Sequence, residues 1–250
     1  MPSWNFSGQV VVITGGAGGL GKSLIAQFLK AGAIVFASDY HRESIEKLKE
    51  IYRDEPNFQA KVVDITVLNQ IETWVKEIAT EAKRIDIVIN AAGICPYDSI
   101  EQVTEELWNR VLDINLKGAF FVSQAVMHLM KEQQYGRIVQ ISSIAGHTGG
   151  AAVSAPYAAS KAGIISIAKS FAKALAPYGV TVNAVAPGPF DTPMIADFPQ
   201  DILDKMASTA AMGRVGKNED VVNAVLFLCD PATSYITGST IDINGGIYMR

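Results

Sequence analysis

The sequence contains little cysteine and has no long apolar run. Its 250 residues include only Cys95 and Cys229, too few for a disulfide framework and without the paired Cys or His spacing of a zinc site. No window offers about 18 uninterrupted apolar residues, and the first residues lack the basic and apolar segments of an export signal. We therefore expect two reduced thiols in a soluble cytoplasmic protein with no membrane partner.

Basic charge is also in short supply. Lys and Arg number 21 against 25 Asp and Glu, which leaves a formal net charge of −4. Proteins that bind nucleic acid usually cluster Lys and Arg against the phosphates, and no such cluster occurs here, so nucleic acid is excluded as an expected partner. The histidines His41, His128 and His147 stand apart, without an HExxH motif or a carboxylate cluster. We therefore expect no metal.

Apolar residues, in contrast, are plentiful and regularly arranged. They make up 49% of the chain, enough for a large core. Short β-branched runs alternate with stretches of helical period, which predicts a parallel sheet with helices on both faces. We expect a single Rossmann-like, doubly wound α/β domain over residues 1–250, with a seven-stranded parallel sheet. The main predicted helices span residues 67–80, 104–131, 157–175 and about 220–228.

A glycine-rich segment, TGGAGGLG at residues 14–21, links the first predicted strand to an amphipathic helix. Glycine lets the backbone approach a pyrophosphate closely, and the helix N-terminus adds free N–H groups and a positive dipole end. The glycines fit two overlapping spacings, G-x-G-x-x-G at Gly16, Gly18 and Gly21 and G-x-x-x-G-x-G at Gly15, Gly19 and Gly21. A dinucleotide is the ligand that this strand, turn and helix predict.

Asp39 ends the second predicted strand, about 20 residues after the last of these glycines. An acidic side chain at this position accepts hydrogen bonds from the adenosine ribose and repels a 2′-phosphate. The glycine segment contains no Lys or Arg, although His41 and Arg42 follow Asp39 closely. NAD is favoured over NADP, with a simple strand-end cap as the alternative role of Asp39.

Tyr157 and Lys161 are four residues apart in a segment of helical period, so both side chains should lie on one helix face. A free phenol has a pKa of about 10, and a nearby ammonium group stabilises the phenolate and lowers that pKa. We therefore expect a lowered pKa for Tyr157 and a role in general acid–base chemistry. Alone, the same spacing is common on helix surfaces.

Together these segments resemble the short-chain dehydrogenases/reductases of the single-domain type. The resemblance covers essentially the whole chain, and the order of its motifs makes it specific. The motifs are TGGAGGLG at 14–21, VVDIT at 62–66, NAAG at 90–93, DINLKG around Asn115, ISS at 141–143, Tyr157 with Lys161, and PGPFDT at 187–192. Phe190 stands where the family more often has an aliphatic residue.

The resemblance implies which residues hold NAD. Asp64 and Ile65 would flank the adenine, residues 90–93 would line the central part of the cofactor, and Thr192 would bind the carboxamide. The full implied set is Gly15, Gly18, Gly19, Leu20, Gly21, Asp39, Asp64, Ile65, Asn90, Ala91, Gly93, Tyr157, Lys161, Pro187, Gly188 and Thr192.

The resemblance also implies four catalytic residues. Tyr157 would donate or take the proton, and Ser143, rather than Ser142, would polarise the substrate carbonyl. Lys161 would also bind the nicotinamide ribose, and Asn115 would hold a water near Lys161.

The predicted substrate pocket is formed by residues 94–97, 146–153 and 190–198, which are mainly small or apolar. This composition suits a small neutral carbonyl or alcohol. Cys95 and His147 are the candidate substrate contacts besides Ser143 and Tyr157.

We therefore expect an NAD-dependent oxidoreductase that interconverts a secondary alcohol and a ketone. One alternative is a 3-oxoacyl thioester (acyl carrier protein) reductase of the same family, which would share every catalytic residue. Such reductases usually take NADPH and offer basic residues to an acidic carrier, whereas Asp39 and the acidic balance point the other way. A second alternative is a non-catalytic NAD-binding regulatory protein, although Ser143, Tyr157 and Lys161 are all present. The resemblance further implies a homotetramer built by helices 104–131 and 157–175 and by the C-terminal segments.

Overall fold

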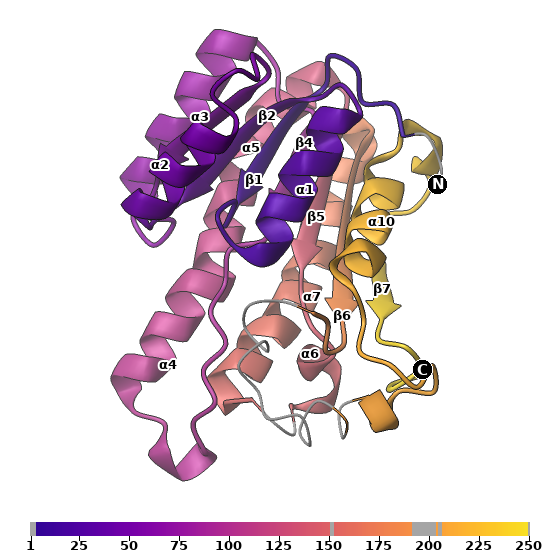
Figure 1. Ribbon diagram of the computed structural model, residues 1–250. Helices are drawn as coiled ribbons and strands as arrows, with labels where there is room; N and C mark the ends of the chain where they lie inside the picture. The colour runs from indigo at the N-terminus through magenta and orange to yellow at the C-terminus, as the bar shows by residue number, and fades with distance from the viewer. Residues whose placement is uncertain (1–3, 151–152, 192–203, 205–206, 250) are drawn as a thin grey trace.

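A parallel sheet of seven strands forms the centre of the molecule (Figure 1). The computed structural model describes residues 4–150, 153–191, 204 and 207–249. The strand order is β3-β2-β1-β4-β5-β6-β7, which confirms the predicted Rossmann-like, doubly wound fold. The strands are β1 Val10–Thr14, β2 Ile34–Asp39, β3 Phe58–Val62, β4 Ile87–Asn90, β5 Gly136–Ile141, β6 Val180–Pro187 and β7 Thr240–Ile243.

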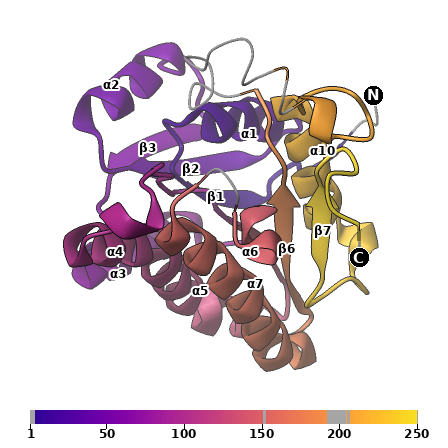
Figure 2. The same cartoon turned by 90° about the horizontal axis from the view of Figure 1, so that it is seen from below.

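Helices cover both faces of this sheet (Figure 2). One face carries α1 (Gly19–Lys30), α2 (Arg42–Ile51) and α10 (Asn218–Cys229), and the other carries α3 (Leu68–Ala82), α5 (Ala119–Gln133) and α7 (Ala155–Leu175). Successive strand residues point to opposite faces. In β1, Val11 and Ile13 enter the first core and Val10 and Val12 the second. This double burial explains why the strands are continuous apolar runs.

The long helix predicted for residues 104–131 is interrupted in the structure. It consists of α4 (Glu105–Leu112), a π-helical turn η2 (Asp113–Gly118) and α5. The prediction was right about the helical path and wrong about its regularity. A π turn is a short, wider turn inside a continuous helical path, and the composition of residues 113–118 does not distinguish it from an α-helical turn. The remaining short elements are α6 Ala145–Thr148 and the 3₁₀ turns η1 Ile100–Gln102, η3 Ala176–Tyr178 and η4 Pro231–Thr233.

The π turn presses against α7 and against the segment after β3. A Cβ added at Gly163 of α7 would lie 2.7 Å from a methyl group of Leu116, and one added at Gly118 would lie 2.7 Å from Cδ1 of Ile65. Glycine at both positions therefore lets three separate segments meet, and it brings Asn115 of the π turn next to α7.

The strand order reverses between β1 and β4. Ligands of such sheets bind at the carboxyl ends of the strands, in the crevice where the order reverses. The predicted motifs follow these ends directly, since β1 ends at Thr14, β4 at Asn90, β5 at Ile141 and β6 at Pro187. Among the helices of the described ranges, none is long and apolar enough to cross a bilayer.

Candidate active site

The glycine turn after β1 is packed so tightly that side chains are excluded. Gly15 has a φ of +69°, and a Cβ added there would lie 2.7 Å from the backbone of Ala92. A Cβ added at Gly21 would run into the carbonyl oxygen of Gly15. The turn therefore needs glycine at both positions to close against the end of β4.

Helix α1 begins at this turn with its amide groups uncovered. Gly18 is the N-cap residue, and within the described chain neither a capping side chain nor an acidic residue occupies the first turn. Free N–H groups at a helix N-terminus suit a phosphate group. The turn and the first residues of α1, including Gly19 and Leu20, thus fit the pyrophosphate of a dinucleotide.

Asp39 lies beside the same turn, at the end of β2. One of its carboxylate oxygens accepts a hydrogen bond from the backbone N–H of Ala17 at 3.2 Å, and the other accepts one from the N–H of His41 at 3.2 Å. The carboxylate is thereby held in place next to the turn by two backbone groups, which fits the predicted ribose contact.

The other predicted cofactor residues follow neighbouring strand ends, with one difference. Asp64 and Ile65 come after β3, and Gly188 follows β6, where its N–H donates to the carbonyl of Ile243. Asn90, however, is buried and points its amide into the core, where it donates to Ser123 Oγ at 2.9 Å. Thr192 lies outside the described residues.

Helix α7 places Tyr157 and Lys161 together. The Lys161 Nζ lies 5.6 Å from the centre of the Tyr157 ring and donates a hydrogen bond to the carbonyl of Ile141 at 2.8 Å. Lys161 is only 5% exposed, and burial lowers its pKa to about 8. A buried amine that changes charge near neutrality is typical of a functional site.

The pKa of Tyr157 is raised, whereas the sequence led us to expect a lowered value. Burial of its hydroxyl is the main cause, and the nearby Cys95 thiol adds to the effect. A hydrogen bond from Ser143 opposes the shift. The expectation failed because Lys161 directs its ammonium group to the Ile141 carbonyl and lies over the face of the tyrosine ring. In this state Tyr157 is a protonated acid.

The two serines after β5 have different partners. Ser142 is buried and donates to the backbone carbonyl of Lys161 at 2.8 Å, which ties β5 to α7. Ser143 reaches the hydroxyl of Tyr157 and also accepts from the N–H of Ala145 at 3.1 Å. This division agrees with the choice of Ser143 over Ser142 as the candidate substrate contact.

Asn115 occupies the π turn and fastens the segment after β4. Its amide donates to Ile94 O and to Ser160 Oγ, both at 3.0 Å, and its Oδ1 accepts from Ile94 N at 2.8 Å. A Cβ added at Gly93 would lie 3.2 Å from Asn115 Oδ1 and 3.4 Å from Lys161 Nζ. Asn115 and Lys161 therefore meet at Gly93.

Cys95 lies inside this cluster of side chains. Its thiol takes part in hydrogen bonds with the phenols of Tyr157 and Tyr97, and burial raises its pKa to about 11. It is therefore a neutral, unreactive thiol at neutral pH. The structure brings together Cys95, Ser143, Tyr157 and Lys161 as the sequence predicted, with Asn115 behind them.

His147 has partners away from this cluster. Its Nε2 lies 3.0 Å from Oδ1 of Asp242 on β7, and its ring stacks on Tyr248 at 5.3 Å. Both contacts join α6 to the C-terminal segment. In the described chain no group of three His, Cys, Asp or Glu side chains could hold a metal ion.

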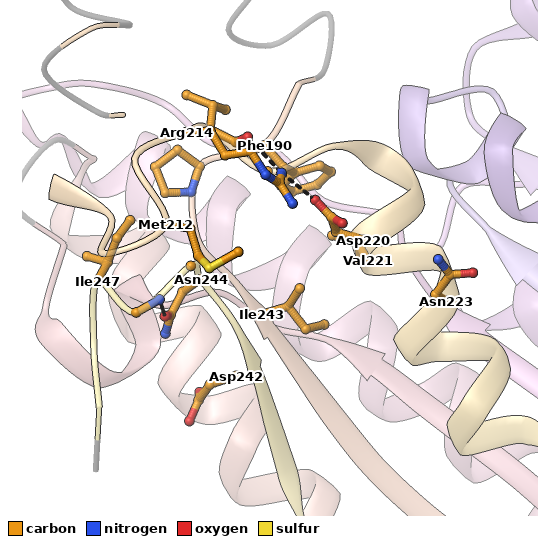
Figure 3. Close-up of a pocket in the computed structure, with 15 residues that line it drawn as sticks. Phe190, Met212, Arg214, Asp220, Val221, Asn223, Asp242, Ile243, Asn244 and Ile247 are labelled. Carbon is orange, nitrogen blue, oxygen red and sulfur yellow. Dashed lines mark hydrogen bonds and ion pairs between the residues drawn. The ribbon is translucent and has the colours of Figure 1, made fainter. Parts of the chain in front are cut away.

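A cavity of about 390 Å³ lies beyond β6, between β7 and the start of α10 (Figure 3). Phe190, Met212, Asn244 and an ion pair between Arg214 and Asp220 at 2.7 Å form parts of its wall. Ser143, Tyr157 and Lys161 are not among its lining residues, so this cavity is separate from the Tyr157 cluster.

Sequence reasoning missed two parts of the site. Tyr97 was expected only as part of a pocket segment, and Ser160, which accepts from Asn115, was not noticed at all. Cys95 and Tyr97 are two residues apart in an irregular segment, where no periodicity tells which way side chains point. Ser160 precedes Lys161 and shows no signal of its own.

A family model described as Enoyl-(Acyl carrier protein) reductase matches residues 15–248. A Rossmann-like sheet with a glycine turn and a buried tyrosine–lysine pair at its carboxyl edge defines an oxidoreductase of the nicotinamide-dependent class. The chain belongs to the short-chain dehydrogenase/reductase family, as the resemblance indicated.

Several relatives are similar over nearly their whole length. The chain is 39% identical to a 3-oxoacyl-[acyl-carrier-protein] reductase of Thermotoga maritima, covering 97% of this chain and 98% of the relative. It is 33% identical to the reductase of the same description from Escherichia coli, covering 98% and 99%. A solved short-chain dehydrogenase/reductase of Brucella melitensis, described as glucose/ribitol dehydrogenase, superimposes with a TM-score of 0.93 at 29% identity and covers 100% of both chains.

Proposed function

We propose that this chain reduces the keto group of 3-oxoacyl compounds to a hydroxyl group. The observation that carries the proposal is the 39% identity, over nearly the whole chain, to a reductase named for that reaction. This is the alternative of the sequence analysis, and the relatives favour it over the broader expectation of a secondary alcohol and a ketone. The protonated Tyr157 next to Ser143 suits reduction, because a carbonyl that gains a hydride also needs a proton.

Ser143 and Tyr157 would act together on the carbonyl oxygen. Ser143 lies close enough to the hydroxyl of Tyr157 to lower its pKa, so both hydroxyl groups can be aimed at one oxygen and meet the negative charge that develops on it. Tyr157 then gives its proton to that oxygen. When bound, a nicotinamide cofactor supplies the hydride.

Lys161 would assist proton donation by Tyr157. With a pKa of about 8, the amine is mostly charged at neutral pH. A positive charge near the tyrosine would stabilise the phenolate that remains after proton transfer, but burial dominates in the structure, where the pKa of Tyr157 is raised. Lys161 also lies next to Gly93 at the end of β4, which suits its implied contact with the cofactor ribose.

We infer NAD as the preferred cofactor. Asp39 is fixed beside the glycine turn by the N–H groups of Ala17 and His41. A carboxylate fixed there favours ribose hydroxyls over a 2′-phosphate. The proposal thus combines a 3-oxoacyl substrate with NADH.

The second candidate is reduction of a small ketone that is not attached to a carrier protein. One observation favours it: the segment that follows Cys95 and Tyr97 carries four carboxylates and only one Arg, at Asp98, Glu101, Glu105, Glu106 and Arg110. All except the half-buried Asp98 are exposed. An acidic carrier protein would be repelled by such a surface.

Two thioesters with the same acetoacetyl group and one simple ketone separate these candidates. We would measure kcat/KM with NADH for the acyl-carrier-protein thioester, for the neutral N-acetylcysteamine thioester, and for a simple ketone. The proposal predicts turnover of both thioesters, and charge reversal by Glu105→Lys with Glu106→Lys should favour the carrier-bound one. Turnover of the simple ketone alone would support the second candidate, and no turnover of any of the three would contradict the proposal.

The homotetramer and the cytoplasmic location remain predictions. The aromatic side chains of Phe120 and Phe121 on α5 are only half buried, which is compatible with a partner subunit on that helix.

A further inference from the structure

The short helix α6 lies between Ser143 and Lys161 of the acid–base cluster. It follows Ser143 directly, and the N–H of Ala145 donates a hydrogen bond to the hydroxyl oxygen of Ser143 at 3.1 Å. On the other side, Gly146 packs so closely on α7 that an added Cβ would lie 2.7 Å from the carbonyl carbon of Lys161. Both contacts are made by the backbone of α6, so the position of this helix sets where Ser143 lies relative to α7.

Helix α6 depends on other parts of the molecule for its position. It has only four residues, Ala145–Thr148, and a helix of one turn is unstable on its own because nucleation is costly. Two of the four side chains are those of alanine and glycine, and Thr148 is exposed. The imidazole of His147 is therefore the side chain of α6 that can reach a distant element.

His147 contacts two residues of the C-terminal part of the chain. Its Nε2 lies 3.0 Å from Oδ1 of Asp242, and its ring stacks on that of Tyr248 with 5.3 Å between the ring centres and 10° between the planes. The side chain of His147 is 10% exposed and that of Asp242 is 20% exposed. Contacts this far from water are screened less than surface contacts.

Both partners of His147 are held firmly. Asp242 belongs to β7, where its neighbour Ile243 packs against the first core, and Figure 3 shows the side chain of Asp242 pointing away from Ile243, as alternation along a strand requires. The carbonyl of Tyr248 accepts a hydrogen bond from the side chain of Asn244 at 3.0 Å. His147 thus connects α6 to a fixed part of the molecule.

We propose that His147 is a positioning residue for Ser143. Its contacts with Asp242 and Tyr248 hold α6 in place, and α6 in turn orients the hydroxyl of Ser143. This role differs from the substrate contact that the sequence predicted for His147. It rests on the proposed function only in taking Ser143 as a group that meets the carbonyl oxygen.

Loss of this anchor should slow the chemical step and leave substrate binding unchanged. A catalytic group that is misplaced by about 1 Å can cost about 10²-fold in rate, and α6 would keep its backbone contacts, so we expect a smaller loss. A hydrogen bond from Ser143 matters most when the carbonyl oxygen becomes negative. Such a loss lowers the rate and does not raise KM.

Three variants test the contact. His147→Leu removes the imidazole, Asp242→Asn removes the charge at equal size, and His128→Leu is the matched control, because His128 also lies beside a carboxylate but its side chain is 86% exposed. We expect His147→Leu and Asp242→Asn each to lower the single-turnover rate of NADH oxidation about three- to tenfold, with KM changed less than about twofold. The double variant should lose no more than His147→Leu alone, and His128→Leu should behave as the wild type.

A Ser143→Ala background separates positioning from a general loss of packing. If His147 acts through Ser143, His147→Leu should have no further effect on the rate in a protein that already carries Ser143→Ala. An equal loss in both backgrounds would show a merely structural role and would overturn the proposal. Denaturant unfolding shows whether each variant is folded at the assay temperature, and if His147→Leu is not, Asp242→Asn takes its place in the same cycle.

Two further results would overturn the proposal. One is a wild-type single-turnover rate in His147→Leu, and the other is a change confined to KM, because His147 would then contact the substrate. If the wild type reduces no 3-oxoacyl thioester, the proposed function fails separately, and the same variants are compared with whichever carbonyl compound is reduced.

Discussion

The cofactor end and the chemical end of this site are built in opposite ways. At the glycine turn, function depends on the absence of side chains, since Gly15 and Gly21 let backbone meet backbone. Around Tyr157, function depends on side chains that reach each other from β5, α7, the π turn and the segment after β4. The glycine turn can be predicted from a local sequence pattern. The side-chain cluster around Tyr157 forms only when distant segments meet in the folded chain.

The largest effect of a single substitution, on both stability and cofactor binding, is expected at the glycine turn. Gly21→Ala places a methyl group against the Gly15 carbonyl, and overpacking of this kind typically costs about 1–3 kcal/mol or more. We expect a loss at the upper end of that range and at least a hundredfold weaker NADH binding, or about 2.7 kcal/mol. Lys30→Ala is the control, because Lys30 is exposed in the last turn of the same helix. Denaturant unfolding and fluorescence titration measure both effects, and equal behaviour of the two variants would refute the packing argument.

The choice between NAD and NADP is expected to depend on the side chain of Asp39, next to the glycine turn. Asp39→Ala combined with Tyr40→Arg should raise the NADP to NAD ratio of kcat/KM at least tenfold, or about 1.4 kcal/mol. The variant removes the carboxylate beside the turn and offers a cation to the 2′-phosphate. Asp54→Ala, at a side chain that is 91% exposed, should leave the ratio unchanged. A wild type that already prefers NADPH tenfold would mean that the role of Asp39 is misassigned.

The buried amine of Lys161 should make the free energy of unfolding depend on pH. The pKa of Lys161 falls from 10.5 to about 8 on folding, so above pH 8 the unfolded chain holds more protons and the free energy of unfolding rises with pH. Burial raises the pKa of Cys95 from 9.0 to about 11 and that of Cys229 further, and both thiols act in the opposite sense as the pH approaches and passes 9, in the wild type and in the variant alike. Between pH 8 and 9 we expect a gain of about 1 kcal/mol that Lys161→Met lacks. Parallel curves for both proteins would contradict this assignment.

The smallest effect is expected where α6 meets β7. His147 and Asp242 form a mostly buried contact of 3.0 Å, and we expect a coupling of about 0.5–1 kcal/mol, at the lower end of the range for side chains in contact. A double-mutant cycle of His147→Gln and Asp242→Asn, followed by denaturant unfolding, should give a coupling of this size with little change in KM. If His147→Gln instead raises KM about tenfold without loss of stability, His147 contacts the substrate as the sequence predicted.

Features that depend on short segments were predicted from the sequence, and features that depend on contacts between distant segments were not. The seven-stranded parallel sheet and the glycine turn follow from alternation and spacing within short segments, and both were predicted, whereas the strand order came from the structure. The π turn around Asn115 was not predicted, because a single wider turn inside a helical path has no residue signature of its own. The pKa of Tyr157 was predicted in the wrong direction, because the spacing of Tyr157 and Lys161 says nothing about burial or about the carbonyl of Ile141 that binds the amine.

We expect Tyr157 to deliver the proton to the substrate, while cofactor binding at the glycine turn does not depend on its hydroxyl group. Tyr157→Phe should lower kcat/KM for the acetoacetyl thioester about 10²- to 10⁴-fold, or roughly 3–5 kcal/mol of barrier. The Kd for NADH, measured by fluorescence titration, should change less than about twofold, because the ring still fills its space. A Tyr157→Phe variant that keeps a tenth or more of the original kcat/KM would contradict the account.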